Sequence, residues 1–200
     1  MIPITKGGLI GHCLRRIVHA LMILIPIFYY IYAQRVLKSP SFDKAQAVSL
    51  VVLIILCLDW VRLKRGWIIF GQRIYEAHTM SAFAWGALSV GLTLLAAPKL
   101  GKYDAAVGFP LIGALALGDP MIGEFRIHGF TAAIQMVVGG MVITCIWLFS
   151  MMWLGTPWWI IPVIVPLTVA SERIKMPHIV DNATMLLIPL GAVLLLAPWC

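Results

Sequence analysis

Two arginines and a histidine near the N-terminus have the spacing of a phosphate site. Arg15 and Arg16 are adjacent, and His19 follows them by four and three residues. All three side chains can therefore line one face of a helix. Two guanidinium groups in that arrangement can hold a phosphate by paired hydrogen bonds. The same residues would also serve as basic anchors where a chain enters a membrane, with an interfacial histidine. The spacing alone leaves both interpretations open.

A carboxylate between glycines marks a second candidate site. Residues 114–126 read ALALGDPMIGEFR, so Gly118 and Asp119 directly precede Pro120. Asp119 suits an N-cap and Pro120 a first helical position, which predicts a helix break at this point. Glycine lets the backbone approach a ligand, and a carboxylate at such a break is also suited to Mg²⁺ or phosphate. The structural and functional interpretations are compatible.

Acid–arginine pairs and late acids complete the candidates. Asp59 and Arg62 are three residues apart near the end of an apolar run, and Arg73 and Glu76 repeat this spacing. Local ion pairing explains each pair alone, although an acid inside an apolar run is costly unless it is paired. A last polar cluster comprises Glu172, Asp181 and Asn182.

The composition indicates which elements position these residues. Apolar residues make up 62% of the chain and charged residues 12%, against roughly 25% charged in a soluble domain. A soluble protein of 200 residues could not bury so much apolar surface. The net charge of +7 does not indicate nucleic-acid binding, because the basic residues stand in short clusters between apolar stretches. We therefore expect one all-α integral membrane domain, in contact with the lipid bilayer.

Apolar stretches of about 20 residues predict roughly seven spans. The expected ranges are 17–33, 45–61, 81–97, 105–117, 130–154, 158–170 and 183–198. With the N-terminus in the cytoplasm and the C-terminus outside, ten of the 15 basic residues fall on the cytoplasmic side. Six of the eight acids and all five histidines fall there too, although the positive-inside rule does not concern them. This sorting predicts a site at the cytoplasmic face. The small size and short loops favour a prokaryotic plasma membrane.

Taken in order, these clusters resemble the motifs of the polyprenol kinase family, the CTP-dependent lipid kinases that include dolichol kinase, phytol kinase and yeast-type diacylglycerol kinase. The resemblance covers nearly the whole chain. The similar elements are Arg15-Arg16-x-x-His19 for the family's Arg-Lys-x-x-His, Asp59-x-x-Arg62 and Glu76 for its acid–arginine element and later glutamate, Gly118-Asp119 for its Gly-Asp, and Glu172, Asp181-Asn182 and Pro189 for its late glutamate, Asp-Asn and final span.

The chain departs from the family pattern in two places. Arg16 stands where the family has lysine, which keeps the charge. After its Gly-Asp the family has a helix of small residues, a Gly-Arg turn and a Lys-Ser or Lys-Thr element. This chain instead reads PMIGEFRIHG and enters an apolar span, with Gly123 early and Glu124 adding a negative charge.

The resemblance implies a lipid-alcohol kinase that transfers the γ-phosphoryl group of CTP to an isoprenoid alcohol such as a polyprenol, dolichol or phytol-like alcohol, with Mg²⁺. By the same resemblance Asp119 binds Mg²⁺ or takes the hydroxyl proton, and Glu172 is a second metal ligand. Phosphate contacts are implied for Arg15, Arg16 and His19, with His19 also a proton relay. Nucleotide or phosphate binding is implied for Gly118, Gly123, Arg62, Arg126, Glu172, Asp181 and Asn182, and a supporting role for Asp59, Glu76 and Glu124. Arg15, Asp119 and Glu172 should then converge in one pocket.

Two other classes of function stay open. A membrane cytidylyltransferase or CDP-alcohol transferase would use related chemistry, but the latter needs an Asp-x-x-Asp-Gly array that the chain lacks. A catalytically degenerate relative or a transporter would use the same charges to bind anionic lipids. Transport predicts ionisable groups near the bilayer midplane, whereas here they lie at the ends of the spans.

Overall fold

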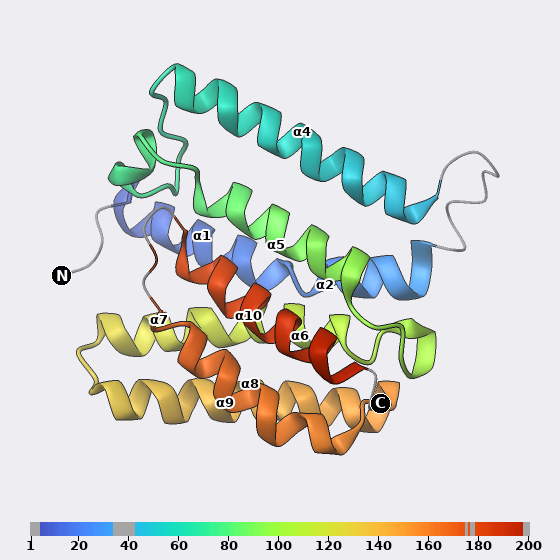
Figure 1. Ribbon diagram of the computed structural model, residues 1–200. Coiled ribbons are helices and arrows are strands. Elements are labelled where there is room, and N and C mark those ends of the chain that lie inside the picture. The colour runs from blue at the N-terminus through green and yellow to red at the C-terminus, as the bar shows by residue number, and fades with distance from the viewer. Residues whose placement is uncertain (1–4, 34–42, 175, 177–178, 198–200) are drawn as a thin grey trace.

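The computed structural model describes residues 5–33, 43–174, 176 and 179–197. Within these residues the protein is all-α and has seven helical segments (Figure 1). The segments are α1 Gly8–Leu21 with α2 Leu24–Ile27 and π-helical η1 Phe28–Tyr32; α4 Lys44–Lys64; α5 Ala82–Ala96; α6 Gly108–Gly113 with π-helical η4 Ala114–Gly118 and α7 Asp119–Ile127; α8 Ala132–Leu154; η5 Trp158–Ile160 with α9 Ile161–Ser171; and α10 Asp181–Leu196. Two short 3₁₀ helices, η2 Ile74–Ala77 and η3 Lys102–Asp104, lie in the loops.

The predicted ranges agree with α4, α5, α8 and the η5–α9 segment to within three residues at each end. The last predicted range begins two residues after the start of α10, and its end at Pro198 lies outside the described residues. Four residues that contributed to the predicted orientation or sorting also lie outside the described residues: Arg35, Lys38, Lys175 and His178.

The first helix begins nine residues before the predicted start at Ile17. Gly7 adopts a left-handed conformation (φ 95°), and α1 starts directly after it. The predicted span began after Arg15 and Arg16, which were expected on one helical face either as phosphate contacts or as basic anchors. In the structure both lie inside α1, where carboxylates from other segments pair with their guanidinium groups.

The predicted helix break at Gly118 is wrong. Gly118 and Asp119 both have helical backbone angles, and η4 runs directly into α7. Pro120 lacks the N–H that a regular helix would need, and its ring would crowd the carbonyl four residues earlier. The wider π-helical turn of η4 accommodates this local change, so the chain continues as a helix with Asp119 on its side.

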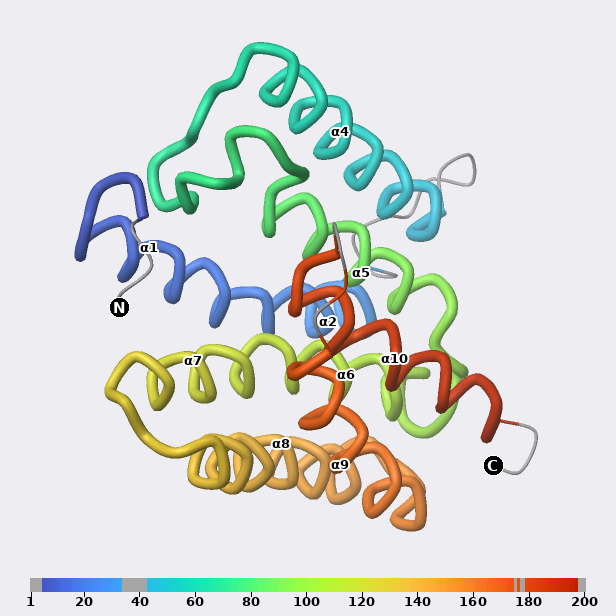
Figure 2. The backbone as a smooth tube through the Cα atoms, turned by 60° about the vertical axis from the view of Figure 1, so that its left-hand side comes forward, coloured from blue at the N-terminus to red at the C-terminus, as the bar shows by residue number. Residues whose placement is uncertain are grey.

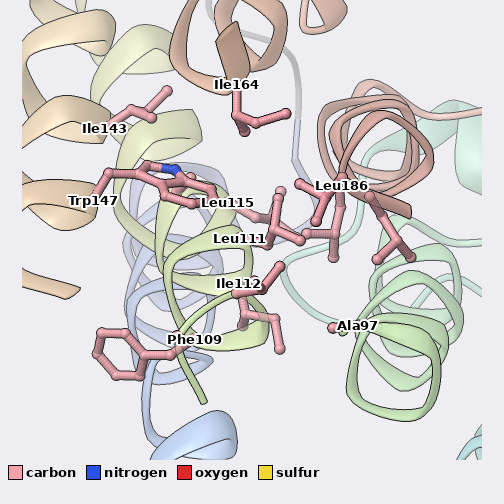
Figure 3. Packing of buried hydrophobic residues seen from close by; sticks show 14 of the residues in the cluster. Ala97, Phe109, Leu111, Ile112, Leu115, Ile143, Trp147, Ile164 and Leu186 are labelled. Atoms are coloured by element: carbon pink, nitrogen blue, oxygen red, sulfur yellow. The ribbon is translucent and has the colours of Figure 1, made fainter. Parts of the chain in front are cut away.

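The core lies around the α6–η4 segment, between α8, α9 and α10 (Figure 3). Trp147 of α8 and Leu115 of η4 are fully buried, and Ile164 of α9 and Leu186 of α10 approach them from the other side. Gly118 belongs to this packing, because a Cβ there would lie 2.8 Å from Ile143 Cγ1. The core therefore fixes the helix that carries Asp119.

Much of the apolar surface faces outwards. Among the described residues, three segments are long and apolar enough to cross a membrane: Gly8–Tyr32, Lys44–Lys64 and Ala132–Leu154. Only 11% of the most apolar window of α4 is buried, because α4 packs chiefly on α5 at the edge of the bundle (Figure 2). So large an exposed apolar surface marks contact with lipid or another apolar partner. Length and composition thus support a membrane location.

Candidate functional site

The polar clusters meet at one end of the helix bundle. The start of α1, the α4–α5 loop, the α7–α8 turn and the α9–α10 loop all lie at the left of Figure 1. We call this the charged end. Chain segments far apart in the sequence are joined there by ion pairs between α1 and η2, between α1 and α7, and between α7 and the end of α9.

Glu76 holds the first of these contacts. Its side chain is buried and accepts a hydrogen bond from Arg15 Nη1 at 2.8 Å. It also accepts from the backbone N–H groups of Arg73 and Ala82, at 3.1 and 3.0 Å. With three donors on its two oxygens, the Glu76 side chain is fixed in position, and it orients Arg15.

Asp59 and Arg62 form a buried pair that holds the α4–α5 loop. Arg62 Nε donates to Asp59 Oδ1 at 2.6 Å, and the other Asp59 oxygen accepts from the backbone N–H of Ser81 at 3.1 Å. The remaining Arg62 donors bind the backbone carbonyls of Trp67, Glu76 and Thr79. Arg62 was predicted to bind phosphate, but its guanidinium is buried and occupied by the chain itself. We assign it to positioning the loop that carries Glu76.

Arg16 faces α7. Its Nε donates to Glu124 Oε1 at 2.8 Å, and His12 Nε2 contacts the same oxygen at 3.0 Å. The contacts with His12 and Arg16 fix the position of the Glu124 carboxylate. Gly123 makes this approach possible, because a Cβ there would lie 2.3 Å from Arg16 Nη2. Gly123 thus makes room for an arginine.

Asp119 lies beside His19 and Arg16. Its Oδ2 is 3.6 Å from His19 Nε2 and 3.9 Å from Arg16 Nη1. His19 Nε2 is 3.1 Å from the carbonyl of Leu115, and a carbonyl can only accept, so Nε2 carries a proton. Residue Leu115 precedes Pro120 by five positions, and a proline there cannot supply the N–H of a π-helical bond. His19 supplies a donor in its place.

Glu172 lies at the end of α9 and pairs with Arg126 of α7. Burial raises the pKa of Glu172 above its usual value; Arg126 opposes this effect, and the charges of Asp119 and Asp181 add to it. These three carboxylates are therefore close enough to interact electrostatically.

An apolar pocket of about 810 Å³ lies between the first helical segment, α4 and α5. It follows the first segment from Leu14 to Ala33, which is about 28 Å at the helical rise. At the far end it reaches Lys44. Its charged end is lined by four polar residues: Arg15, His19, Gln72 and Asn182. Its shape and chemistry suit a long apolar chain with a polar head.

A second, more polar pocket of about 520 Å³ lies at the charged end. It is formed by residues 73–80, α7, α8 and the described part of the α9–α10 loop. Its charged lining consists of Arg73, Glu76, Arg126, Glu172, Arg173 and Asp181. The volume falls within the roughly 300–1,000 Å³ of small-molecule sites.

One ion pair joins the linings of the two pockets. Arg15 lines the apolar pocket and donates to Glu76, which lines the polar pocket. At the start of α10 the neighbours Asn182 and Asp181 likewise face one pocket each. A head group at the charged end of the apolar pocket would therefore lie next to the contents of the polar pocket.

Arg15, Asp119 and Glu172 were predicted to converge in one pocket, but neither of these two pockets is lined by all three. Arg15 lines the apolar pocket, Glu172 lines the polar one, and Asp119 lines neither. The sequence prediction also left Arg73 and Arg173 out of the site, although both line the polar pocket. The spacing of Arg73 and Glu76 suggested a local ion pair, whereas the Glu76 side chain binds the Arg73 backbone N–H and the Arg15 guanidinium.

In the part of the chain that the structure describes, no group of three or more His, Cys, Asp or Glu side chains is arranged to hold a metal ion. Asp119 faces Arg16 and His19, so it does not share a ligand set with Glu172. Mg²⁺ is often held by only one or two carboxylates together with substrate phosphates. Glu172 and Asp181, which line the polar pocket, fit that role.

Comparison with known proteins gives no match: no family model, no curated protein and no solved structure is similar to this chain.

Proposed function

We propose that this protein is a lipid-alcohol kinase embedded in a membrane by its seven helical segments, with the charged end in the cytoplasm. It transfers the γ-phosphoryl group of a nucleoside triphosphate, CTP by the resemblance, to the hydroxyl of an isoprenoid alcohol. The basic residues of the described loops gather mostly at the charged end, which supports this orientation.

One observation carries the proposal: the linings of a long apolar pocket and of a polar pocket with several arginines are joined by the Arg15–Glu76 pair. A lipid alcohol has an apolar chain and one reactive hydroxyl, and its co-substrate is a highly charged anion. The two substrates therefore need adjoining sites of opposite character. The apolar pocket would direct the hydroxyl towards Arg15 and His19, at the border of the polar pocket.

The reaction needs little covalent chemistry from the protein, because phosphoryl transfer depends mainly on position and charge. The alcohol oxygen attacks the γ-phosphorus, the bond from that phosphorus to the β–γ bridging oxygen breaks, and the nucleoside diphosphate leaves. The hydroxyl proton passes to Nδ1 of His19, which lines the apolar pocket, while the Nε2 proton of His19 passes to Asp119, whose Oδ2 is 3.6 Å away. Arg15 stabilises the negative charge on the transferred group.

Mg²⁺ fits this scheme at Glu172 and Asp181, which can share it with the phosphates of the donor. When bound there, the ion would neutralise phosphate charge. Arg16 remains paired with Glu124, and its guanidinium places a positive charge 3.9 Å from Asp119 Oδ2.

The test uses purified protein with γ-labelled CTP or ATP, Mg²⁺ and isoprenoid alcohols of several lengths. Label is expected in an organic-soluble monophosphate, and Asp119→Asn is expected to lower the rate about a hundredfold or more. Asp104→Asn is the matched control, because Asp104 lies in η3 and, unlike Asp119, has no ion-pair contact with His19 or Arg16. Folded protein that binds alcohols but transfers no label from either donor would refute the kinase and indicate a lipid-binding protein.

A further inference from the structure

Arg73 has a buried hydrogen-bond donor without a partner. Its Nη1 donates to the hydroxyl of Tyr75 at 2.8 Å, but its buried Nε has no hydrogen-bond partner among the described residues. A buried donor of a charged group is costly to leave unpaired, so such a donor beside a pocket indicates an absent acceptor. Nε and Nη2 form one edge of the planar guanidinium, and this edge can bind two phosphate oxygens side by side.

The backbone holds Arg73 in place before any ligand binds. Its N–H donates to Glu76 Oε1, and Arg73 forms an antiparallel bridge with Thr5 of the N-terminal segment. Lys6 strengthens that junction, since its backbone N–H donates to the carbonyl of Gln72 at 2.9 Å. A guanidinium on a fixed backbone loses less conformational entropy when it binds an anion.

Two further arginines line the same pocket from other segments. Arg126 on α7 pairs with Glu172, while Arg173 beyond α9 is exposed and donates to the carbonyl of Ala132 at 3.3 Å. Neither Arg73 nor Arg173 has a carboxylate within ion-pair distance in the described part of the chain. Of the three arginines that line the pocket in the described part of the chain, two therefore lack a direct counter-charge there.

The carboxylates of the pocket narrow the choice of anion. Glu172 and Asp181 line it as well and would repel a bare anion of one phosphate. A phosphate chain carried as its Mg²⁺ complex has both signs of charge and matches both sets of residues. The volume of about 520 Å³ also leaves room for more than one phosphate group.

We propose that Arg73 anchors a polyphosphate subsite in the polar pocket, completed by Arg126 and Arg173. The edge formed by Nε and Nη2 binds oxygens of the phosphate chain of a nucleoside triphosphate. The identity of this ligand as the phosphoryl donor rests on the proposed function. The anion site itself rests on the unpartnered donor and on the residues of the pocket.

The test measures the binding of inorganic triphosphate with Mg²⁺ to the purified full chain, by calorimetry in neutral-lipid nanodiscs. Arg73→Lys keeps the charge but loses the flat edge, and it should weaken binding about tenfold or more; Arg73→Ala should weaken it further. Arg65→Lys is the matched control and should bind like the unmodified protein. Arg65 belongs to the same loop but stacks on the ring of Trp67 at 4.6 Å and lines neither pocket.

Two more arms separate the possible outcomes. Tyr75→Phe removes the partner of Nη1 but leaves the edge formed by Nε and Nη2, so it should retain triphosphate binding. A loss equal to that of Arg73→Lys would mean that the two residues act only as a structural pair and would overturn the proposal. Nanodiscs rich in an anionic lipid should leave triphosphate binding unchanged. If that lipid competes with triphosphate, and if the competition is lost when Arg73 is replaced, the arginines bind lipid head groups. This result would also overturn the proposal.

Failure here is distinguishable from failure of the proposed function. If Arg73→Lys binds triphosphate as tightly as the unmodified protein while lipid phosphorylation continues, the subsite is wrong and the kinase stands. If binding depends on Arg73 but no alcohol is phosphorylated, the subsite stands and the kinase is wrong.

Discussion

Gly86 is the position at which the proposed role of the apolar pocket can be tested by size. It lies on α5 and lines the pocket, and a Cβ there would be 3.7 Å from Met22 Cε, an ordinary contact. Alanine at this position should therefore be tolerated, whereas the longer side chain of leucine would extend into the pocket. Ala82 lines the pocket nearer the charged end, four residues or about 6 Å before Gly86. Leucine would obstruct the pocket at about this depth.

The expected fall in kcat/KM comes from steric crowding in the pocket. Lost burial of the alcohol chain does not contribute, because a chain excluded from the pocket would remain in lipid that is equally apolar. Forcing extra methylenes into a filled apolar site costs about 1–3 kcal/mol. For an alcohol of four isoprene units, kcat/KM should fall about fivefold to 150-fold. An alcohol of one isoprene unit ends before the obstruction, so its kcat/KM should change little.

The assay compares kcat/KM for the two alcohols in Gly86→Leu, Gly86→Ala and Gly140→Leu. Gly140 is the matched control: it is a helical glycine whose Cβ would lie 3.7 Å from Val169 Cγ2, and it lines neither pocket. Only Gly86→Leu should change the ratio of the two values. An equal loss for both alcohols, or no loss for the long one, would show that the chain of the alcohol does not bind in the apolar pocket at Gly86.

Three further predictions concern the charged end. Gly123→Ala should displace Arg16 and lower kcat about tenfold or more while the unfolding temperature changes little, since a partly exposed ion pair contributes at most about 1 kcal/mol; kinetics and a thermal melt check this, and unchanged kinetics would contradict it. Arg62→Met should destabilise the protein by about 3–5 kcal/mol, because it leaves Asp59 buried and unpaired. Unfolding in a denaturing detergent measures this loss, and a loss below about 1 kcal/mol would contradict the prediction. The raised pKa of Glu172 means that it takes up a proton at a higher pH than an ordinary glutamate, so Mg²⁺ binding with triphosphate should weaken as the pH falls towards that pKa. Calorimetry should show a smaller pH dependence for Glu172→Gln than for the unmodified protein, and an equal dependence in both would argue against the assignment.

The long apolar helices could be predicted from the sequence because their limits follow from composition alone. Helices α4 and α8 have clear polar or glycine boundaries, so the predicted and observed ranges nearly coincide. The start of α1 and the continuity through Gly118 could not be read in the same way. Both depend on tertiary contacts, which pair charges inside a helix in one case and pack a glycine against α8 in the other.

The grouping of the polar clusters at one end follows from helices that alternate in direction, and the sequence predicts it. Which acid pairs with which base depends on side-chain directions between segments. Local spacing pairs Arg73 with Glu76, whereas in the structure Glu76 binds Arg15 from a helix 61 positions earlier. Local spacing does pair Asp59 with Arg62, but it does not reveal that this pair is buried.

The most direct test of the account is to locate the head and tail of a bound lipid alcohol. One photoreactive analogue carries a diazirine beside the hydroxyl and another carries it at the end of the chain, and the cross-linked residues are identified by mass spectrometry. The analogue with its diazirine beside the hydroxyl should label α1 near Arg15 and His19. The analogue with its diazirine at the chain end should label the far end of the apolar pocket near Lys44. Labelling of the outer surface of α8 by both analogues, or of the far end by the hydroxyl analogue, would contradict it.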